Sequence, residues 1–253
     1  MSVEKLLADL QVKQFTGTRE GIDLLEGDAE LQRAVAAFAT DETADVLSGH
    51  EVLGQGKFSV VAGIGDVAVK TATRETNQYS SSRFRRADNL IGQMTYMAAL
   101  HEHFRQPALA EADLHVPEQF FALRTRKGNY LSAQQRMHAV EPLGIWDDRQ
   151  GPILLPERAE VFGTIRDRIL EAIPKGDDQL SIGLGDIKAP KPDYVHGGNI
   201  LIPVETDNPH EGPLCIIDQP GQDDLGKAAA RVAAHYLQRL SNGGRPILRR
   251  FTA

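Results

Sequence analysis

Two glycines one residue apart precede a pair of apolar segments, the second of which ends in a lysine. Gly54 and Gly56 are followed by Phe58-Ser59, and the later segment closes with Lys70. Glycines followed by an aromatic and β-branched residues are typical of a strand that turns sharply and returns as a second strand. Such glycines let backbone N–H groups approach a chain of phosphates. The pattern therefore predicts a phosphate-binding hairpin, although a glycine hairpin that binds no ligand has the same local sequence.

This segment differs from the two most familiar phosphate-binding loops. In a dinucleotide-binding fingerprint the last glycine opens a helix, whereas strand-forming residues follow Gly56. A P-loop ends in Gly-Lys-Ser or Gly-Lys-Thr, but Gly56-Lys57 precedes a phenylalanine. The tight turn Gly63-Ile64-Gly65-Asp66 then joins the second strand to the third. We therefore expect consecutive antiparallel strands here and no helix.

A second group of polar residues has the chemistry of a magnesium site. Phosphoryl transfer uses one carboxylate near the acceptor hydroxyl and two oxygen-bearing side chains on the metal. Asn199 precedes the apolar run 200–202, and Asp218 ends the apolar run 214–217. A loop through residues 206–209 joins these runs as a hairpin, which would place Asn199 and Asp218 at the open ends of neighbouring strands.

The order of these motifs resembles that of the protein-kinase-like superfamily, over roughly residues 50 to 240. Gly-x-Gly-x-Phe-Ser-x-Val followed by Val-Ala-Val-Lys is similar to the nucleotide-binding half. His196-x-Gly198-Asn199-Ile200-Leu201 and Ile216-Ile217-Asp218 look like the metal-binding segments of aminoglycoside-phosphotransferase-like kinases. The resemblance implies an α+β, two-lobed protein-kinase-like fold, with an antiparallel five-stranded N-lobe and a reduced, mainly helical C-lobe.

The resemblance also implies roles for individual residues. The glycines would cover the phosphates of ATP, Val61 and Ala68 would sandwich the adenine, and Lys70 would hold the α- and β-phosphates. The Asn199 and Asp218 side chains would bind Mg²⁺. The full nucleotide-binding set that it implies is Gly54, Gly56, Phe58, Ser59, Val61, Ala68, Lys70 and Gln93.

Two positions depart from the family pattern. The helix that follows Lys70 normally supplies a glutamate to pair with the lysine, and Gln93 occupies that position; Glu75 is an upstream alternative. A glutamine can accept a hydrogen bond from Lys70 but brings no countercharge. The catalytic aspartate is also displaced. The family position holds Tyr194, so the candidates are Asp193, one residue earlier, and Asp186, which begins an Asp-Ile-Lys segment.

The chain is expected to have three parts. Residues 1–49 look mainly helical from their hydrophobic periodicity and form an N-terminal helical extension. The resemblance implies that residues 50–138 form the N-lobe and that residues 139–253 form the reduced C-lobe with the catalytic and metal-binding loops. Helices are expected over 1–12, 29–39, 90–104, 157–173 and from Asp224 to Leu240, strands over 116–123 and 129–137, a hinge at 135–138, and a basic tail over 245–253.

Composition limits the class of protein. The chain has 253 residues, 41% hydrophobic residues and a formal net charge of -7, which argues against a general nucleic-acid or anionic-membrane binder. Cys215 is the only cysteine, so no disulfide forms within the chain. No apolar run approaches the roughly 18 residues of a membrane span, and we expect a cytoplasmic location.

The sequence therefore predicts an ATP-dependent, Mg²⁺-requiring kinase that moves the γ-phosphate to a hydroxyl group of an unidentified small-molecule or protein acceptor. The alternative is a pseudokinase, which is a regulatory module that binds nucleotide without transferring phosphate. Transfer of AMP in place of phosphate is a third reading. The residues do not indicate the oligomeric state.

Overall fold

The computed structural model divides the chain into two compact units. Unit 1 comprises Met1–Met94, Glu118–Arg136 and Arg239–Ala253, and unit 2 comprises Thr95–Pro117 and Met137–Gln238. The structure describes residues 2–41, 44–55, 60–72, 94, 97–98, 101, 114–138, 140–142, 144–147, 151–154, 200–203, 214–217 and 249–252.

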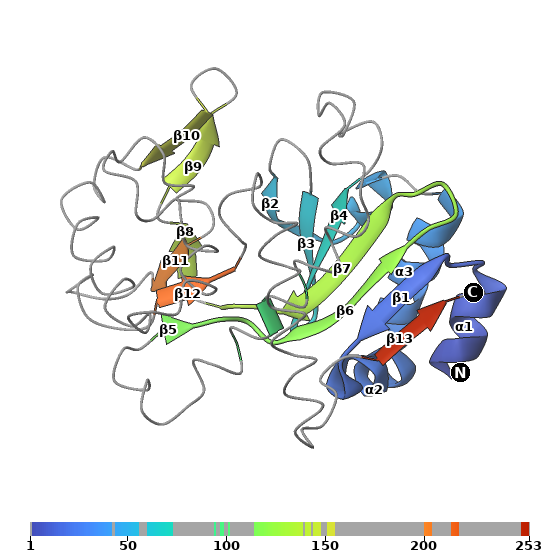
Figure 1. The fold of residues 1–253 in the computed structure, drawn as a ribbon. Helices are drawn as coiled ribbons and strands as arrows, with labels where there is room; N and C mark the ends of the chain where they lie inside the picture. Colours follow the sequence, from blue (N-terminus) through green and yellow to red (C-terminus); the bar gives the residue numbers. More distant parts are fainter. Residues whose placement is uncertain are drawn as a thin grey trace. The chain divides into compact units, whose positions relative to one another are not determined.

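Unit 1 is built on a seven-stranded antiparallel sheet in the order β13-β1-β6-β7-β4-β3-β2. Figure 1 shows β13 beside β1, next to the β6–β7 hairpin. The strands are β1 (Gln14–Gly17), β2 (Glu51–Gln55), β3 (Val60–Ile64), β4 (Val67–Ala72), β6 (Gln119–Arg124), β7 (Tyr130–Gln135) and β13 (Arg249–Thr252).

Five of these strands were predicted, and they are neighbours in the sheet. The β3–β4 turn falls on Gly65 and Asp66, where Gly65 has a φ of 54°, a conformation that glycine adopts without steric cost. Two strands were missed. The N-terminal segment is not entirely helical because it contains β1, and the expected basic tail contains β13. Both are four-residue strands, too short to show a clear alternation.

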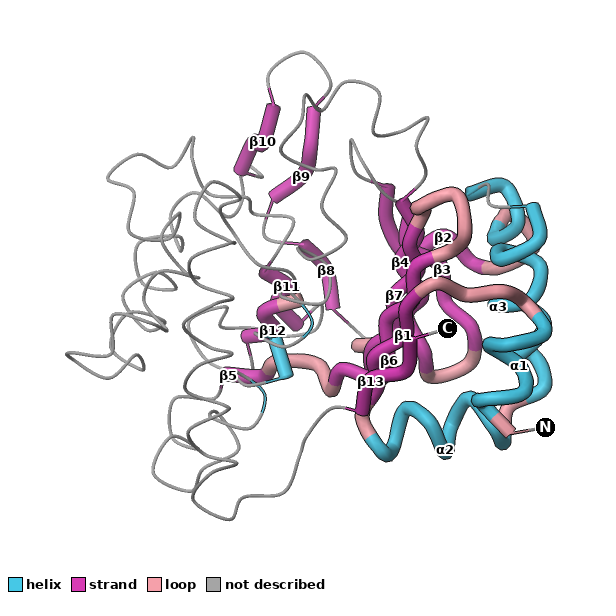
Figure 2. The backbone as a smooth tube through the Cα atoms, turned by 45° about the vertical axis from the view of Figure 1, so that its right-hand side comes forward, coloured by secondary structure: helices cyan, strands magenta, loops and turns pink. Residues whose placement is uncertain are grey.

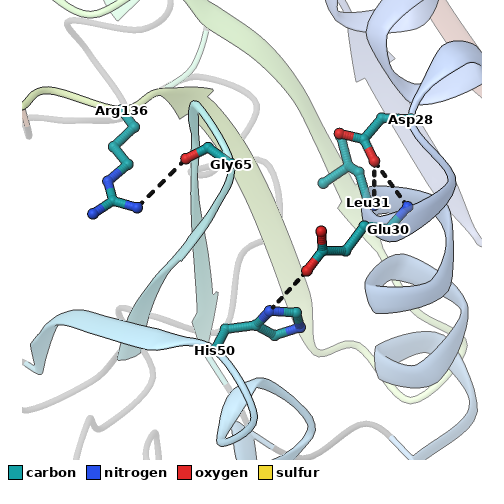
Figure 3. Close-up of polar contacts among 6 residues, drawn as sticks. All are labelled: Asp28, Glu30, Leu31, His50, Gly65 and Arg136. Carbon is teal, nitrogen blue, oxygen red and sulfur yellow. Dashed lines mark hydrogen bonds and ion pairs between the residues drawn. The ribbon is translucent and has the colours of Figure 1, made fainter.

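Three helices of unit 1 cover one face of its sheet (Figure 2). They are α1 (Val3–Asp9), α2 (Arg19–Gly27) and α3 (Ala29–Asp41), and the 3-10 helix η1 (Ala44–Leu47) follows them. Helices were expected at the positions of α1 and α3, whereas α2 was not predicted. Each of the three helices is preceded by a residue that suits an N-cap, namely Ser2, Thr18 and Asp28. Figure 3 shows the third case, in which the Asp28 carboxylate accepts from the N–H groups of Glu30 and Leu31, at 2.8 and 2.9 Å.

The helices and the sheet share one hydrophobic core. Its largest fully buried side chains include Phe38 and Leu25 from the helices and Phe121 from the sheet. Phe15 and Phe121 stack with ring centroids 5.7 Å apart. At the start of α3, His50 Nδ1 lies 3.5 Å from the Glu30 carboxylate (Figure 3).

The described residues of unit 2 form two small sheets. The four-stranded sheet has the order β5-β12-β11-β8, with β12 and β5 parallel and the other pairs antiparallel, and β9 and β10 form an antiparallel pair. The strands are β5 (Leu114–His115), β8 (Val140–Pro142), β9 (Gly144–Asp147), β10 (Gly151–Leu154), β11 (Ile200–Pro203) and β12 (Leu214–Ile216).

The structure describes only a few of the residues after position 89 for which the sequence predicted helices. The described residues of the segment expected to be helical over 90–104, namely Met94, Met97, Ala98 and His101, do have helical backbone. The helices expected over 157–173 and 224–240 lie outside the described residues. Among the described helices, none is both long and apolar enough to cross a membrane.

The contact between α2 and β6 leaves no space for a side chain at Gly21. A Cβ there would lie 2.1 Å from the carbonyl oxygen of Phe120, which also accepts a hydrogen bond from the Thr18 N–H at 2.8 Å. We expect Gly21→Ala to lower the free energy of unfolding by about 3 kcal/mol, the upper range of overpacking costs, because both partners are backbone.

Gly27, in the same helix, is the matched control for this measurement. A Cβ at Gly27 meets nothing within 4 Å, so Gly27→Ala should stabilise the protein by up to about 1 kcal/mol through helix propensity. Urea unfolding of the two variants checks both values. Equal stability of the Gly21 variant and the wild type would contradict the packing described here.

Candidate functional site

Lys70 lies near the middle of the seven-stranded sheet. It is directly opposite Val61 on β3 and Ser132 on β7 in the antiparallel ladders. Directly opposed residues of antiparallel strands project to the same side of the sheet. The three residues therefore form a row on one face, which we call the Lys70 face, and all three are partly exposed.

The same row extends to the glycine hairpin. Gly54 on β2 is paired with Val61, so this glycine lies two strands away from Lys70. Ala68 precedes Lys70 by two residues on β4 and therefore projects to the same side. Gly54, Val61, Ala68 and Lys70, the four described members of the predicted nucleotide-binding set, thus share the Lys70 face.

The opposite face of these strands is the one that packs on the helices. Val67 and Val69 alternate with Ala68 and Lys70 along β4, and both valines belong to the core shared with α1–α3. Ala68 is also buried but is not part of that core cluster. The period of two along a strand therefore directs Lys70 away from the helical layer.

A small hydrophobic cluster lies on the Lys70 face as well. Met94 is 3% exposed and packs with Ala122 and Tyr130. Ala122 is paired with Ser132, the neighbour of Lys70, so this cluster marks the same side of the sheet. Met94 itself therefore lies against the Lys70 face of unit 1.

In unit 2, β11 and β12 form the antiparallel hairpin strands that the sequence predicted. Ile200 is paired with Ile216, and Leu201 with Cys215. Cys215 and Ile202 are buried, so the ladder contributes to the interior of unit 2. Asn199 and Asp218 flank the described part of this ladder in the sequence, and both lie outside the described residues.

Several predicted site residues are therefore not placed by the structure. Of the nucleotide-binding set these are Gly56, Phe58, Ser59 and Gln93; of the catalytic and metal-binding sets they are Asp186, Asp193, Asn199 and Asp218. Within the described ranges, no three His, Cys, Asp or Glu side chains gather into a group that could hold a metal ion.

The chemistry of the Lys70 face suits a phosphate-bearing ligand that also has a flat apolar part. Lys70 supplies an ammonium group, which interacts with phosphate as a point charge. Val61 and Ala68 supply small apolar surface beside it, and Gly54 leaves backbone accessible because nothing would lie within 4 Å of a Cβ at that position.

Two groups of this region were not singled out by the sequence analysis. Ser132 is the direct neighbour of Lys70 on β7. The sequence alone does not show this contact, because it depends on which strand pairs with β4 and in which register. Arg136, at the end of β7, has its guanidinium 2.5 Å from the Glu51 carboxylate. These residues are 85 positions apart, and no local pattern indicates such a pair.

Comparison with known proteins adds no relative. No model of a protein family matches the chain, and neither a curated protein nor a solved structure matches it.

Truncating a valine should lower the free energy of unfolding by different amounts on the two faces of the sheet. Val69 is fully buried in the helical core and Val61 is partly exposed on the Lys70 face. We expect Val69→Ala to lower the free energy of unfolding by about 2–3 kcal/mol, the transfer of two methyl groups plus a cavity, and Val61→Ala by less than about 1 kcal/mol. Denaturant titrations measure both, and equal costs would contradict the assignment of faces.

Proposed function

We propose that this protein is an ATP-dependent phosphotransferase of the protein-kinase-like type, which moves the γ-phosphate to a hydroxyl group of a small-molecule or protein acceptor. The observation that carries the proposal is the register of the sheet in unit 1. It aligns Gly54, Val61 and Lys70 across three neighbouring strands and puts Ala68 on the same face. A nucleotide bound on that face would meet a glycine hairpin, apolar surface and an ammonium group together.

The strand on which Lys70 lies also supports the proposal. Counted from the glycine hairpin, β4 is the third strand, and protein kinases carry their phosphate-binding lysine on the third strand of the first lobe. The five predicted strands are contiguous in the sheet, in the order β6-β7-β4-β3-β2. The extra strands β1 and β13 add beyond β6, on the side away from the glycine hairpin.

The position of Met94 is a third line of support. In protein kinases the helix that follows the lysine strand provides the residue that pairs with the lysine. Met94 is helical and contacts Ala122 and Tyr130 on the Lys70 face, and Gln93 is its neighbour in the sequence. In this proposal Gln93 takes the place of the usual glutamate as a neutral hydrogen-bond partner of Lys70.

In this proposal Asn199 and Asp218 would be the metal ligands, and an aspartate would orient the acceptor. The β11–β12 ladder pairs Ile200 with Ile216, which agrees with the hairpin expected to present Asn199 and Asp218 at one end. When bound, Mg²⁺ would neutralise charge on the β- and γ-phosphates. Asp193, or Asp186 in its place, would accept a hydrogen bond from the acceptor hydroxyl.

A pseudokinase that binds nucleotide in the cytoplasm as a regulatory module is the second candidate. Two observations favour it. Gln93 brings no negative charge to Lys70, and Tyr194 stands where the family has its catalytic aspartate. Both candidates require the Lys70 face to bind nucleotide, and they differ only in whether phosphate is transferred.

The proposal predicts that the chain binds MgATP and that Lys70→Met weakens this binding. Lys127→Met is the matched control, because Lys127 lies on the exposed turn between β6 and β7. Isothermal titration with MgATP should show at least a tenfold loss of affinity, about 1.4 kcal/mol, for the Lys70 variant and none for the control. Equal binding by Lys70→Met and the wild type would overturn the site.

Phosphate transfer is tested separately with ATP labelled at the γ-position, incubated with cell extracts or candidate hydroxyl compounds. For a kinase, Asp218→Ala should reduce label transfer at least about 100-fold, the scale of losing one electrostatic group of a catalytic site. Nucleotide binding with no transfer by the wild type supports the pseudokinase. In a parallel reaction with ATP labelled at the α-position, transfer of that label without transfer of the γ-label would indicate transfer of AMP.

A further inference from the structure

Arg136 connects the end of β7 to two other parts of the glycine-hairpin region. Its backbone N–H donates to the carbonyl oxygen of Asp66 at 2.8 Å, in the β3–β4 turn. Its Nη1 donates to the Gly65 carbonyl oxygen at 3.4 Å, which Figure 3 shows. Its Nη2 donates to Glu51 Oε2 at 2.5 Å, at the start of β2.

The guanidinium lies on the Lys70 face. A Cβ added to Gly63 would come within 2.6 Å of Arg136 Nη1 and 3.0 Å of its Cζ, so the planar group rests directly above this glycine. Gly63 is paired with Ala68 on β4, and the two positions share the Lys70 face. Arg136 therefore lies next to the position of Ala68, one of the two residues that the kinase resemblance assigns to the adenine of the nucleotide.

The two partners of the ion pair have different surroundings. The Arg136 side chain is 18% exposed and the Glu51 side chain is 63% exposed. Arg136 Nε is buried and has no hydrogen-bond partner among the described residues. A mostly buried guanidinium depends on its remaining partners more strongly than an exposed one does, so the contacts to Glu51 and Gly65 fix the side chain in place.

The strand that Arg136 holds lies at an edge of the sheet and has an irregular ladder. β2 is at the edge of the sheet and pairs with β3 alone. Its ladder is interrupted by a register shift between Val52 and Gly54, and Val52 and Leu53 are the exposed large hydrophobic residues among those described. The ion pair from Arg136 gives this strand a second attachment, three residues before Gly54.

We propose that Arg136 is a positioning residue for the nucleotide: through Glu51 and the β3–β4 turn it holds β2, and with it the glycine hairpin, at a fixed distance from Lys70. This inference rests on the proposed function. Without the attachment, β2 would have to become ordered when nucleotide binds. The entropy cost of this ordering would reduce the favourable free energy of binding and so weaken the affinity. The loss should therefore fall on KM for MgATP and much less on kcat.

Three variants break the attachment at different points. Arg136→Ala removes the guanidinium, Glu51→Gln removes the charge of an exposed partner, and Gly63→Ala displaces the guanidinium from its resting place. Arg126→Ala is the matched control, because Arg126 is exposed and donates to Gln11 Oε1 at 3.0 Å, in a contact away from β2. Arg136→Lys retains the charge without the planar fork and should restore only part of the effect.

The experiment measures the dissociation constant and KM for MgATP, kcat for phosphate transfer, and amide hydrogen exchange of residues 51–55. For the three variants we expect about a tenfold rise in KM and in the dissociation constant, less than a twofold change in kcat, and faster exchange confined to β2. The control should match the wild type. For a wild type without transfer activity, the dissociation constant replaces KM.

Two results would overturn the inference. One is unchanged exchange in residues 51–55 together with unchanged nucleotide affinity in Glu51→Gln and Gly63→Ala. The other is a loss of affinity in the Arg126 control as large as that in Arg136→Ala. A wild type that binds no nucleotide would overturn the proposed function instead, and the exchange measurement would then decide by itself whether Arg136 holds β2.

Discussion

The packing of α1–α3 against one face of the seven-stranded sheet is the interaction on which the rest of unit 1 depends. It buries Val67, Val69 and their neighbours on β3, β6 and β7 in a single core. Because side chains alternate along a strand, a shift of register by one residue would expose this core and bury Lys70. The hydrophobic effect therefore fixes which side of the sheet Lys70 occupies, without any contribution from a ligand. The same constraint brings Gly54, Val61 and Ala68 to that side.

Much of the fold could be predicted where a local pattern was strong. The turn at Gly65 and the apolar, β-branched segments on either side of it located β3 and β4, and the apolar runs near residues 200 and 214 located β11 and β12. The same reasoning missed β1 and β13, because four residues are too few to show a period and their pairing is supplied by distant strands. It also missed α2, because glycines at positions 21 and 27 lower the helix propensity of this short segment. Gly21 is in fact the residue that allows the helix to approach the backbone of β6.

In the candidate site too, some residues can be recognised from local sequence and others cannot. Lys70 and the glycines stand out because their types and spacing are local properties of the sequence. Ser132 and the Arg136–Glu51 pair became visible only with the register of β7 against β4 and the position of the β3–β4 turn. Such residues share a site because strands far apart in sequence are neighbours in the sheet. A pattern read along the chain carries no information about this kind of proximity, whereas it does carry information about which face of a strand is apolar.

The placement of β13 has a consequence for how the protein is made. Its partner β1 leaves the ribosome long before residues 249–252 do. The sheet of unit 1 also needs β6 and β7, which are synthesised after the first segment of unit 2. During translation β1 must therefore wait with an unpaired edge, and exposed edges of this kind are the sites at which nascent chains associate wrongly. Contacts between such distant segments also slow folding, so the seven-stranded sheet is complete only after residues 249–252 have been synthesised.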